Sequence, residues 1–245
     1  IVNWDAAAAL KEDGSVVTWG SSTTISNAGD VDLSSNVTTL YATTQAFAAM
    51  KTDRSIVCWG RPDKGGNCAD IADALRCTET VYSNAESFAA IQGGGSVVTW
   101  GGAGQSGGDS SGVDLSTGVV TISATEVAYA ALTLSGSVIT WGNSRLGGDS
   151  SSVASQLASG VKAVFGGMYS FVAYKVDGSV VTWGYAHDVD SSTGSNSSAL
   201  DGGIAVVFGA QTIFTANPSN PTSLDACPAG ESRYVVSSEG LSVMS

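Results

Sequence analysis

The stretch KVDGSVVTWG occupies residues 175–184, and near copies of it occur four more times in the chain. The copies are KEDGSVVTWG at 11–20, KTDRSIVCWG at 51–60, QGGGSVVTWG at 92–101 and TLSGSVITWG at 133–142. Their Trp residues are separated by 40, 41, 41 and 42 residues. A catalytic site is needed once in a chain, whereas a repeat of fixed period predicts a repetitive architecture such as a propeller or a solenoid.

Two further marks recur in the same phase as the Trp-Gly pair. A short word of small and aromatic residues precedes each copy: AAAAL, FAAM, FAAI, YAAL and FVAY. A leucine follows each copy after a variable segment: Leu33, Leu75, Leu115, Leu157 and Leu200. Three marks in one phase indicate that the whole unit of about 41 residues is repeated, and not one motif alone.

Each unit predicts three short strands. FAAIQ (88–92) is apolar enough to be buried on both faces, SVVTWG (96–101) is β-branched and ends at Gly, and VVTISAT (119–125) alternates apolar with polar residues. The DG and GG dipeptides before the Trp-Gly strand are typical of hairpin turns. The segment from Trp-Gly to Leu is rich in Gly, Ser and Asp and is predicted to be a loop. The fold class is therefore all-β.

A sixth unit begins but is degenerate. IAVVFGAQTIFTAN (204–217) matches VKAVFGGMYSFVAYK (161–175), yet no Trp-Gly follows it. The chain also opens in the middle of a unit, just before the AAAAL word. We therefore predict a single β-propeller domain of about six blades over residues 1–245. Residues 218–245 would close the ring beside the N-terminal strands, which removes exposed sheet edges.

The repeated word DGSVVTWG, preceded by an Ala-rich strand and followed by a Gly-rich loop, resembles the regulator of chromosome condensation repeat family. The repeat length is most similar to that of the bacterial β-lactamase-inhibitory propellers. The resemblance covers residues 1 to about 217. It implies a β-propeller with blades of three or four strands that acts through loops on its faces. It does not name a function, because propellers host many.

Charge and hydropathy exclude two classes of partner. Ten basic against 22 acidic residues give a formal net charge of −12. Nucleic acids and anionic membrane surfaces attract clustered Lys and Arg, so neither is an expected partner. No window reaches the roughly 18–20 apolar residues of a membrane span. Only 13% of the residues are charged, and Ser, Thr and Gly are frequent. This composition favours an extracellular β protein with an adhesive or glycosylated surface.

No catalytic constellation is expected, and we predict that the protein is not an enzyme. GQSGG (104–108) fits the G-x-S-x-G pattern around Ser106, but the residues on both sides of it are predicted to form a loop. The single histidine, His187, lies in another repeat and is also too isolated to indicate a zinc site. Asp109 and Asp149 carry oxygen ligands that suit calcium, but we expect them to cap turns. The predicted cofactor set is none, with calcium as the alternative.

The Trp residues of the repeat are predicted to be core wedges between blades, because each ends a buried strand. Trp100 and Trp141 are the central examples. The alternative is an exposed aromatic ladder that binds sugars. Trp4 lies outside the repeat phase and is expected on the surface.

Cysteines and glycosylation sequons point to secretion. Cys58, Cys68, Cys77 and Cys227 allow three pairings. We expect Cys68 to pair with Cys77, which leaves Cys58 and Cys227 to close the ring; four reduced thiols are the alternative. Sequons at Asn36 (NVT) and Asn196 (NSS) lie in predicted loops, where N-linked glycans would be accessible. Disulfides persist outside the cytosol, so the expected location is extracellular or secreted.

These observations predict a non-enzymatic repeat protein that acts as a binding or self-assembling structural module. Its partner would be a protein or a second copy of the chain. One alternative is a subunit of a surface fibre or coat that polymerises; another is an enzyme-inhibitor-type propeller. The loops after Trp-Gly differ most between repeats and are expected to carry the contacts. Arg61, Arg145 and Tyr185 are the predicted partner-binding residues, since Arg and Tyr are common anchors of interfaces.

Overall fold

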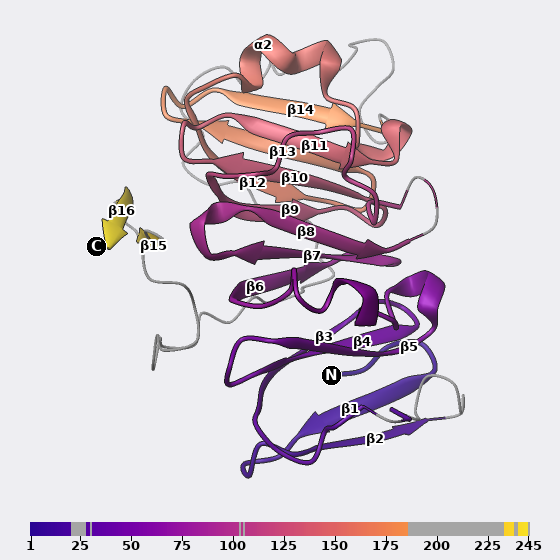
Figure 1. Cartoon of the computed structure of the whole chain (residues 1–245). Helices are drawn as coiled ribbons and strands as arrows, with labels where there is room; N and C mark the ends of the chain where they lie inside the picture. The colour runs from indigo at the N-terminus through magenta and orange to yellow at the C-terminus, as the bar shows by residue number, and fades with distance from the viewer. Residues whose placement is uncertain are drawn as a thin grey trace.

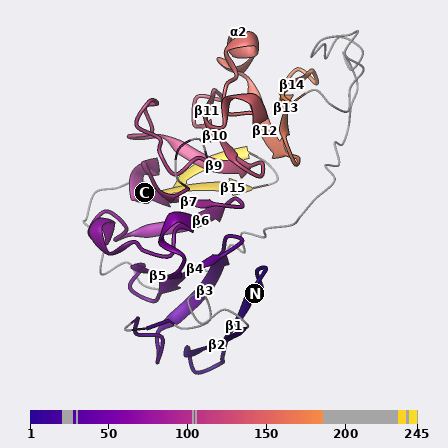
Figure 2. The ribbon, with the colours of Figure 1, turned by 90° about the vertical axis from the view of Figure 1, so that its right-hand side faces the viewer.

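The structure is a computed structural model of the 245-residue chain. It describes residues 1–185 apart from 21–27, 30, 103 and 105, together with the backbone of residues 233–237 and 240–244. Within the described residues the chain is almost entirely β-structure, arranged in small antiparallel sheets that follow one another in chain order (Figures 1 and 2).

Each of the first five sheets along the chain corresponds to one sequence repeat and forms one blade. Blade 1 has two strands, β1 (Ala6–Leu10) and β2 (Val16–Gly20). Blades 2 to 5 have three strands each, and in each of them the second strand in the chain is the central one. Their bounds are β3 (Val37–Ala42), β4 (Ala46–Lys51) and β5 (Ile56–Gly60); β6 (Thr78–Ser83), β7 (Ser87–Gln92) and β8 (Val97–Gly101); β9 (Val119–Ala124), β10 (Ala128–Thr133) and β11 (Val138–Gly142); β12 (Val161–Gly166), β13 (Ser170–Lys175) and β14 (Val180–Gly184).

Short helices lie in the turns and in the segments that the sequence predicts to be loops. They are the 3₁₀ helices η1 (Pro62–Lys64), η2 (Ala69–Ile71), η3 (Gly93–Gly95), η4 (Ser144–Leu146) and η5 (Ser151–Val153), and the four-residue helix α2 (Ala154–Leu157). The C-terminal strands β15 (Arg233–Ser237) and β16 (Gly240–Met244) pair antiparallel with each other. The expected sixth unit at 204–217 lies outside the described residues, and so does most of the expected closing segment.

The blades pack through two chemically different faces, because successive side chains of a strand point to opposite sides. We call the side that carries the Trp of the repeat the Trp face and the other side the reverse face. In blade 3 the Trp face presents Phe88, Ala90 and Trp100, and it packs on Ala46 and Ala48 of the reverse face of blade 2. The same contact recurs between every pair of successive blades from 1 to 5.

Four of the five repeated Trp residues are core residues, as predicted, whereas Trp19 of blade 1 is 54% exposed. Trp100 and Trp141 are buried, and so are their counterparts Trp59 and Trp183. Each stacks on an aromatic ring of its own central strand, with ring centroids 5.1–5.2 Å apart. The phased leucines fill the same clusters from the loops: Leu33, Leu75, Leu115 and Leu157.

In blades 3 to 5 a hydrogen bond joins the Trp to the loop of the preceding blade. The indole nitrogen of Trp100 donates to the carbonyl of Gly65, at 3.2 Å. Trp141 and Trp183 make the equivalent bonds to Gly107 and Gly147, both at 3.0 Å. A Cβ on Gly65 would lie 2.6 Å from the ring of Phe88 in the next blade, so only glycine fits there. This contact explains the glycine pairs of the loops.

Candidate binding face

A row of turns runs along one end of the blades. Each turn joins the first strand of a blade to its central strand, and backbone hydrogen bonds connect one turn to the next. Thr44 N donates to Ala85 O, Ala85 N to Glu126 O and Glu126 N to Met168 O, each at 3.0 Å. Trp4 N donates to Thr44 O at 3.2 Å, so the row begins at the N-terminal blade. We call Trp4, Thr44, Ala85, Glu126 and Met168 the turn row.

The loops that follow Trp-Gly start at this same end. Arg61 N donates to Gln45 O at 3.0 Å, and Tyr185 N donates to Tyr169 O at 2.9 Å. Gln45 and Tyr169 directly follow the turn-row residues of their blades. The structure therefore places the predicted contact residues Arg61 and Tyr185 at the turn-row end, in blades 2 and 5.

Arg145 belongs to the corresponding loop of blade 4. It lies in η4, two residues after Asn143, whose backbone nitrogen donates to Val127 O at 3.0 Å. Arg61 and Arg145 are both exposed. The three predicted residues share one end of the molecule but stand in different blades, and a binding role for them stays a prediction.

Four exposed apolar or aromatic side chains gather near the two ends of the turn row. Trp4 is 78% exposed, Met168 65%, Tyr185 48% and Tyr169 36%. Tyr169 and Tyr185 pack edge to face, with ring centroids 6.3 Å apart. A hydrogen bond to the Glu126 carboxylate raises the pKa of Tyr169. Sequence reasoning identified Trp4 and Tyr185 but missed Met168 and Tyr169, because only the turn row reveals their common position.

Arg61 is paired with a neighbouring carboxylate at this end. The Arg61 guanidinium contacts both carboxylate oxygens of Asp63, at 2.7 and 3.0 Å, and lowers the pKa of that carboxyl. It also donates to Gln45, whose amide donates to Asp5 at 3.1 Å. Arg61 is thus held in one orientation by its neighbours. Such preorganisation reduces the conformational entropy that a side chain loses on binding.

The contacts of Ser106 indicate a structural role for this residue. Its hydroxyl donates to Glu86, which is also paired with Lys64. The backbone carbonyl of Ser106 accepts from the buried side chains of Asn84 and Ser87, at 2.8 and 2.6 Å. Through these contacts, Ser106 holds the loop that follows β8 against the turn between β6 and β7 of the same blade.

A buried polar network surrounds Tyr129, which replaces the Phe found at this position in blades 2, 3 and 5. Its hydroxyl donates to Ser87 O at 2.7 Å and accepts from Asn84 N at 3.1 Å. Complete burial raises the pKa of Tyr129, so the hydroxyl stays protonated. The sequence shows the Phe-to-Tyr change, but it does not show that the hydroxyl reaches the preceding blade.

The predicted turn roles of Asp109 and Asp149 are confirmed. Each carboxylate accepts the backbone N–H two residues later, Ser111 N and Ser151 N, both at 2.9 Å. These bonds lower the pKa of both carboxyls. Across the described ranges, no group of three or more His, Cys, Asp or Glu side chains is arranged to hold a metal ion. His187 lies outside those ranges.

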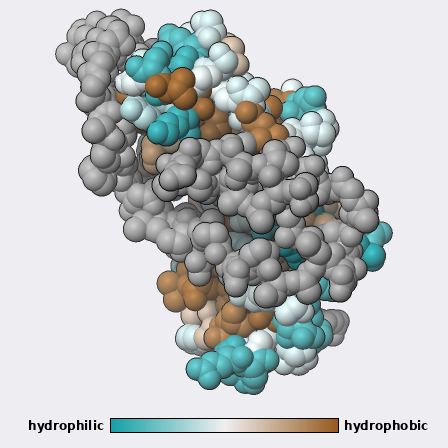
Figure 3. Space-filling view, turned by 90° about the vertical axis from the view of Figure 1, so that its left-hand side faces the viewer, coloured by the Kyte–Doolittle hydropathy of each residue, from teal (hydrophilic) through white to brown (hydrophobic). Residues whose placement is uncertain are grey.

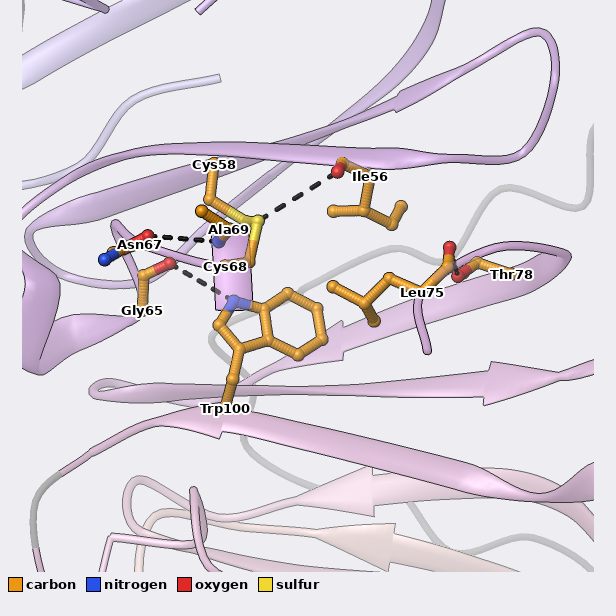
Figure 4. Close-up of a disulfide and its surroundings, with 9 residues drawn as sticks. All are labelled: Ile56, Cys58, Gly65, Asn67, Cys68, Ala69, Leu75, Thr78 and Trp100. Carbon is orange, nitrogen blue, oxygen red and sulfur yellow. Dashed lines mark hydrogen bonds between the residues drawn. A yellow bond between two sulfur atoms is a disulfide. The ribbon is translucent and has the colours of Figure 1, made fainter. Parts of the chain in front are cut away.

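The expected pairing of Cys68 with Cys77 is wrong, and so is that of Cys58 with Cys227. Cys58 is bonded to Cys68, with the two Cα atoms 5.8 Å apart (Figure 4). Cys77 is disulfide-bonded as well. Counting residues along the loop suggested the Cys68–Cys77 bond, but the loop folds back so that Cys68 lies against β5. The bond faces blade 3 and packs near Trp100 in the same cluster.

The Cys58–Cys68 bond occupies the place of a hydroxyl pair in the neighbouring blades. Thr99 and Ser110 in blade 3 have their hydroxyl oxygens 3.0 Å apart, and Thr140 and Ser150 in blade 4 repeat that distance. Cys58 aligns with the two Thr residues, and Cys68 aligns with the two Ser residues. Aligning the loops on their glycine pairs shows that these positions are equivalent in the three blades, and the structure shows that they meet.

The sequon at Asn36 is on the surface. Asn36 is exposed and has a φ of 64°, and its side-chain nitrogen donates to Ser35 Oγ at 3.2 Å. The second sequon, at Asn196, lies outside the described residues. Glycosylation at either asparagine stays a prediction.

Comparison with known proteins supports the architecture. No protein-family model and no curated sequence matches the chain. The ectodomain of the receptor kinase CR4 from Physcomitrella patens is similar, with TM-score 0.52 and 15% identity over 74% of this chain and 52% of that one. Human WBSCR16 has TM-score 0.51 and 15% identity, over 74% and 60% of the two chains.

Yeast RCC1 (Prp20), solved with Kap60, has TM-score 0.46 and 16% identity over 74% of this chain and 54% of that one. The chain thus spans about half to three fifths of the length of these structures. At this identity the likeness concerns the fold, and the expected all-β propeller is confirmed. No helix among the described residues is long and apolar enough to cross a membrane.

Proposed function

We propose that this chain is a non-enzymatic protein-binding module and that its partner docks at the turn-row end. The carrying observation is the exposed set Trp4, Met168, Tyr169 and Tyr185 beside the rigid turn row. Aromatic residues and Met are enriched in protein interfaces, and aromatic rings provide large contact areas at small entropic cost. The backbone bonds of the turn row hold this surface in place before a partner arrives.

The chemistry of this end favours a partner that presents Lys or Arg. Asp5 and Glu126 place carboxylates next to Trp4 and Tyr169, and the chain as a whole carries a net charge of −12. Cations are attracted to the faces of Trp and Tyr rings, and a nearby carboxylate adds to the attraction. Arg61 is already paired with Asp63, so it adds little free positive charge.

The absence of catalysis is part of the proposal. Ser106, the centre of the G-x-S-x-G match, is engaged with Glu86 in a structural network. An extracellular or secreted location is also proposed. It is supported by the disulfide Cys58–Cys68, because such bonds persist in oxidising compartments. The enzyme-inhibitor alternative rests on the resemblance in repeat length alone.

A peptide selection tests the binding proposal. Random peptides displayed on phage are selected against the wild-type protein, and the enriched peptides are measured against Trp4→Ala and Tyr185→Ala. The matched control is Val176→Ala, an exposed apolar residue in the turn between β13 and β14, at the other end of the blade. We expect Lys- or Arg-containing peptides whose affinity falls roughly tenfold or more in the first two variants, as for interface anchors. If the enriched peptides bind all three variants with equal affinity, the binding site lies elsewhere on the protein.

Self-assembly is the second candidate function, and one observation favours it. The described arc ends in a Trp face at blade 1 and a reverse face at blade 5, and these two kinds of face pack together between all other blades. A head-to-tail contact of two different faces forms open filaments when it does not close into a ring. Size-exclusion chromatography with light scattering distinguishes a monomeric binding module from a filament. A 24.6 kDa particle at all concentrations contradicts the filament.

A further inference from the structure

The blade 5 end of the turn row holds two tyrosine rings at nearly a right angle. Tyr169 follows Met168 of the turn row, and Tyr185 is the first residue after β14, whose arrow points to this end in Figure 1. The backbone nitrogen of Tyr185 donates to Tyr169 O at 2.9 Å. The planes of the two rings are 87° apart, with their centroids at 6.3 Å. Both rings are exposed, so they form an open corner with two aromatic walls.

A carboxylate lies at the edge of this corner. Glu126 stands in the turn of blade 4, and its backbone nitrogen donates to Met168 O at 3.0 Å, which holds it beside the turn of blade 5. The Glu126 side chain is exposed and accepts a hydrogen bond from the Tyr169 hydroxyl. Among the residues that the structure describes, no Lys or Arg forms an ion pair with Glu126. The corner therefore combines two ring faces with a negative charge that no described cation neutralises.

Blade 2 shows what the equivalent positions do when the chain supplies its own cation. Gln45 and Arg61 occupy the positions of Tyr169 and Tyr185 and make the same backbone bond, at 3.0 Å. The Arg61 guanidinium donates to the Gln45 side chain at 3.0 Å and is paired with Asp63. In blade 5 both positions are rings, and cations are attracted to the faces of such rings. This pair of positions thus holds a cation of the chain itself in blade 2 and presents a site for an external cation in blade 5.

We propose that Tyr169, Tyr185 and Glu126 form the subsite for a lysine side chain of the protein partner. The inference rests on the proposed docking of that partner at the turn-row end, and it names the group that the partner presents there. An ammonium ion in the corner contacts ring faces on two sides and is attracted by the Glu126 carboxylate. The methylene stem of the lysine packs along the apolar ring surface.

Lysine fits this corner better than arginine does. A lysine ammonium is a compact point charge with three donors, whereas a guanidinium is a flat fork that binds carboxylates through two parallel N–H groups. The two walls stand at 87° to each other, so a flat group can stack on only one of them. The Glu126 carboxylate also accepts from the Tyr169 hydroxyl, which competes with the second N–H of a fork. The shape of the corner therefore selects a compact ammonium.

A titration with small probes tests the subsite. Butylammonium chloride reproduces the lysine side chain, butan-1-ol is its neutral analogue and propylguanidinium chloride represents arginine. Binding is followed by NMR of the ring signals of Tyr169 and Tyr185 in protein labelled with carbon-13 tyrosine, at constant ionic strength because salt screens exposed charges. We expect butylammonium to bind roughly two- to fivefold more tightly than either other probe, as for a cation–π contact at an exposed site. Equal affinity for butan-1-ol, or tighter binding of propylguanidinium, overturns the proposal.

Two variants separate the parts of the corner. Tyr185→Leu removes one wall, and Glu126→Gln removes the charge but keeps an acceptor for the Tyr169 hydroxyl. Each should weaken butylammonium binding roughly two- to fivefold, and Glu126→Gln should leave the affinity for butan-1-ol unchanged. The opposite side of the molecule also exposes hydrophobic side chains (Figure 3), and Val176→Ala in the turn between β13 and β14 is the matched control that should bind as the wild type. Unchanged butylammonium binding in Tyr185→Leu overturns the proposal.

The outcome is separate from that of the peptide selection. If the corner does not bind butylammonium while the selected peptides still lose affinity in Trp4→Ala, the lysine subsite is wrong and docking at the turn-row end stands. If the corner binds butylammonium while the selected peptides bind Trp4→Ala and Tyr185→Ala as tightly as the wild type, the corner is an ammonium site and the docking proposal is wrong.

Discussion

At the scale of single residues, one position of the hairpin turn departs from the pattern of the other repeats. Arg54 has a φ of 65°, in the left-handed region where Gly14, Gly136 and Gly178 occupy the equivalent turns. Left-handed backbone brings Cβ close to the following carbonyl oxygen, which costs an L-residue roughly 1–2 kcal/mol. The neighbouring turns avoid this cost with glycine.

Replacing Arg54 by glycine is expected to stabilise the protein. The gain should be about 0.5–1 kcal/mol, because relief of backbone strain exceeds the entropy that glycine loses on folding. Chemical denaturation measures this gain in the free energy of unfolding. The reciprocal change Gly136→Arg serves as the control and should destabilise, since a Cβ at Gly136 would lie 3.1 Å from Gly160 N. A loss of stability in Arg54→Gly would contradict the argument.

Trp141 should be far more important for stability than Trp4. Trp141 is buried, stacks on Tyr129 and donates to Gly107 at 3.0 Å, so truncation to Ala should cost about 3–5 kcal/mol. Trp4→Ala is the matched control and should change stability little, because its ring is in solvent. Urea unfolding gives both values. Unchanged stability of Trp141→Ala combined with lost sugar binding would instead support an aromatic ladder.

At the scale of elements, the turns share one carboxylate motif. An Asp accepts the backbone N–H of the Ser two residues later, as Asp13 does from Ser15 and Asp32 does from Ser34. The Ser hydroxyls donate to the same oxygens, and together these bonds lower the pKa of Asp13 and Asp32 from 3.8 to about 2. Asp53, Asp114 and Asp177 make the same contacts, and the pKa of each is lowered.

Stability should therefore fall in acid and be insensitive to pH near neutrality. A carboxyl with a lower pKa in the folded chain stabilises fully above its ordinary pKa of 3.8 and loses that contribution as the pH drops towards about 2. Thermal unfolding between pH 7 and pH 2 measures the effect. Ser15→Ala is the specific control, because it should raise the pKa of Asp13 in an NMR titration. A melting temperature that is constant down to pH 2 would disprove this role of the turns.

The disulfide in blade 2 and the hydroxyl pairs in blades 3 and 4 should be interchangeable. Cys58→Thr with Cys68→Ser is expected to fold and to lose about 2–3 kcal/mol, as for removal of a short disulfide loop. Conversely, Thr140→Cys with Ser150→Cys should form a disulfide, because the replaced oxygens are 3.0 Å apart. Non-reducing peptide mapping checks both variants. A Thr140→Cys/Ser150→Cys protein that stays reduced under oxidising conditions would show that the blades are not equivalent here.

At the scale of the whole molecule, closure of the ring is the main open prediction. Deleting 233–245 should abolish cooperative unfolding if this segment completes the last blade, because an open arc leaves strand edges and an apolar face in water. Calorimetry of the truncated chain measures this. An unchanged melting temperature means that these residues do not close the ring.

The sequence predicted the blades well and their contacts incompletely. Trp100 and Trp141 could be assigned to the core because each ends a strand that the repeat predicts to be buried, and this packing recurs between successive blades. The disulfide could not, because the path of the loop after β5 decides which sulfur atoms meet. Met168 and Tyr169 were missed for a similar reason: their shared surface is created by hydrogen bonds between blades, which leave no local pattern.

The Trp-to-glycine hydrogen bonds between successive blades have a consequence for how such a chain could grow. Trp141 of blade 4 bonds to a carbonyl of blade 3, and Trp183 of blade 5 bonds to the matching carbonyl of blade 4. Blades 3 and 4 therefore each carry both the donor for the preceding blade and the acceptor for the following one. An in-frame duplication of the gene segment for one unit would create no orphan donor and no mismatched face at the new junctions. Changes in blade number are accordingly accessible in a single genetic step, with the curvature of the ring as the remaining constraint.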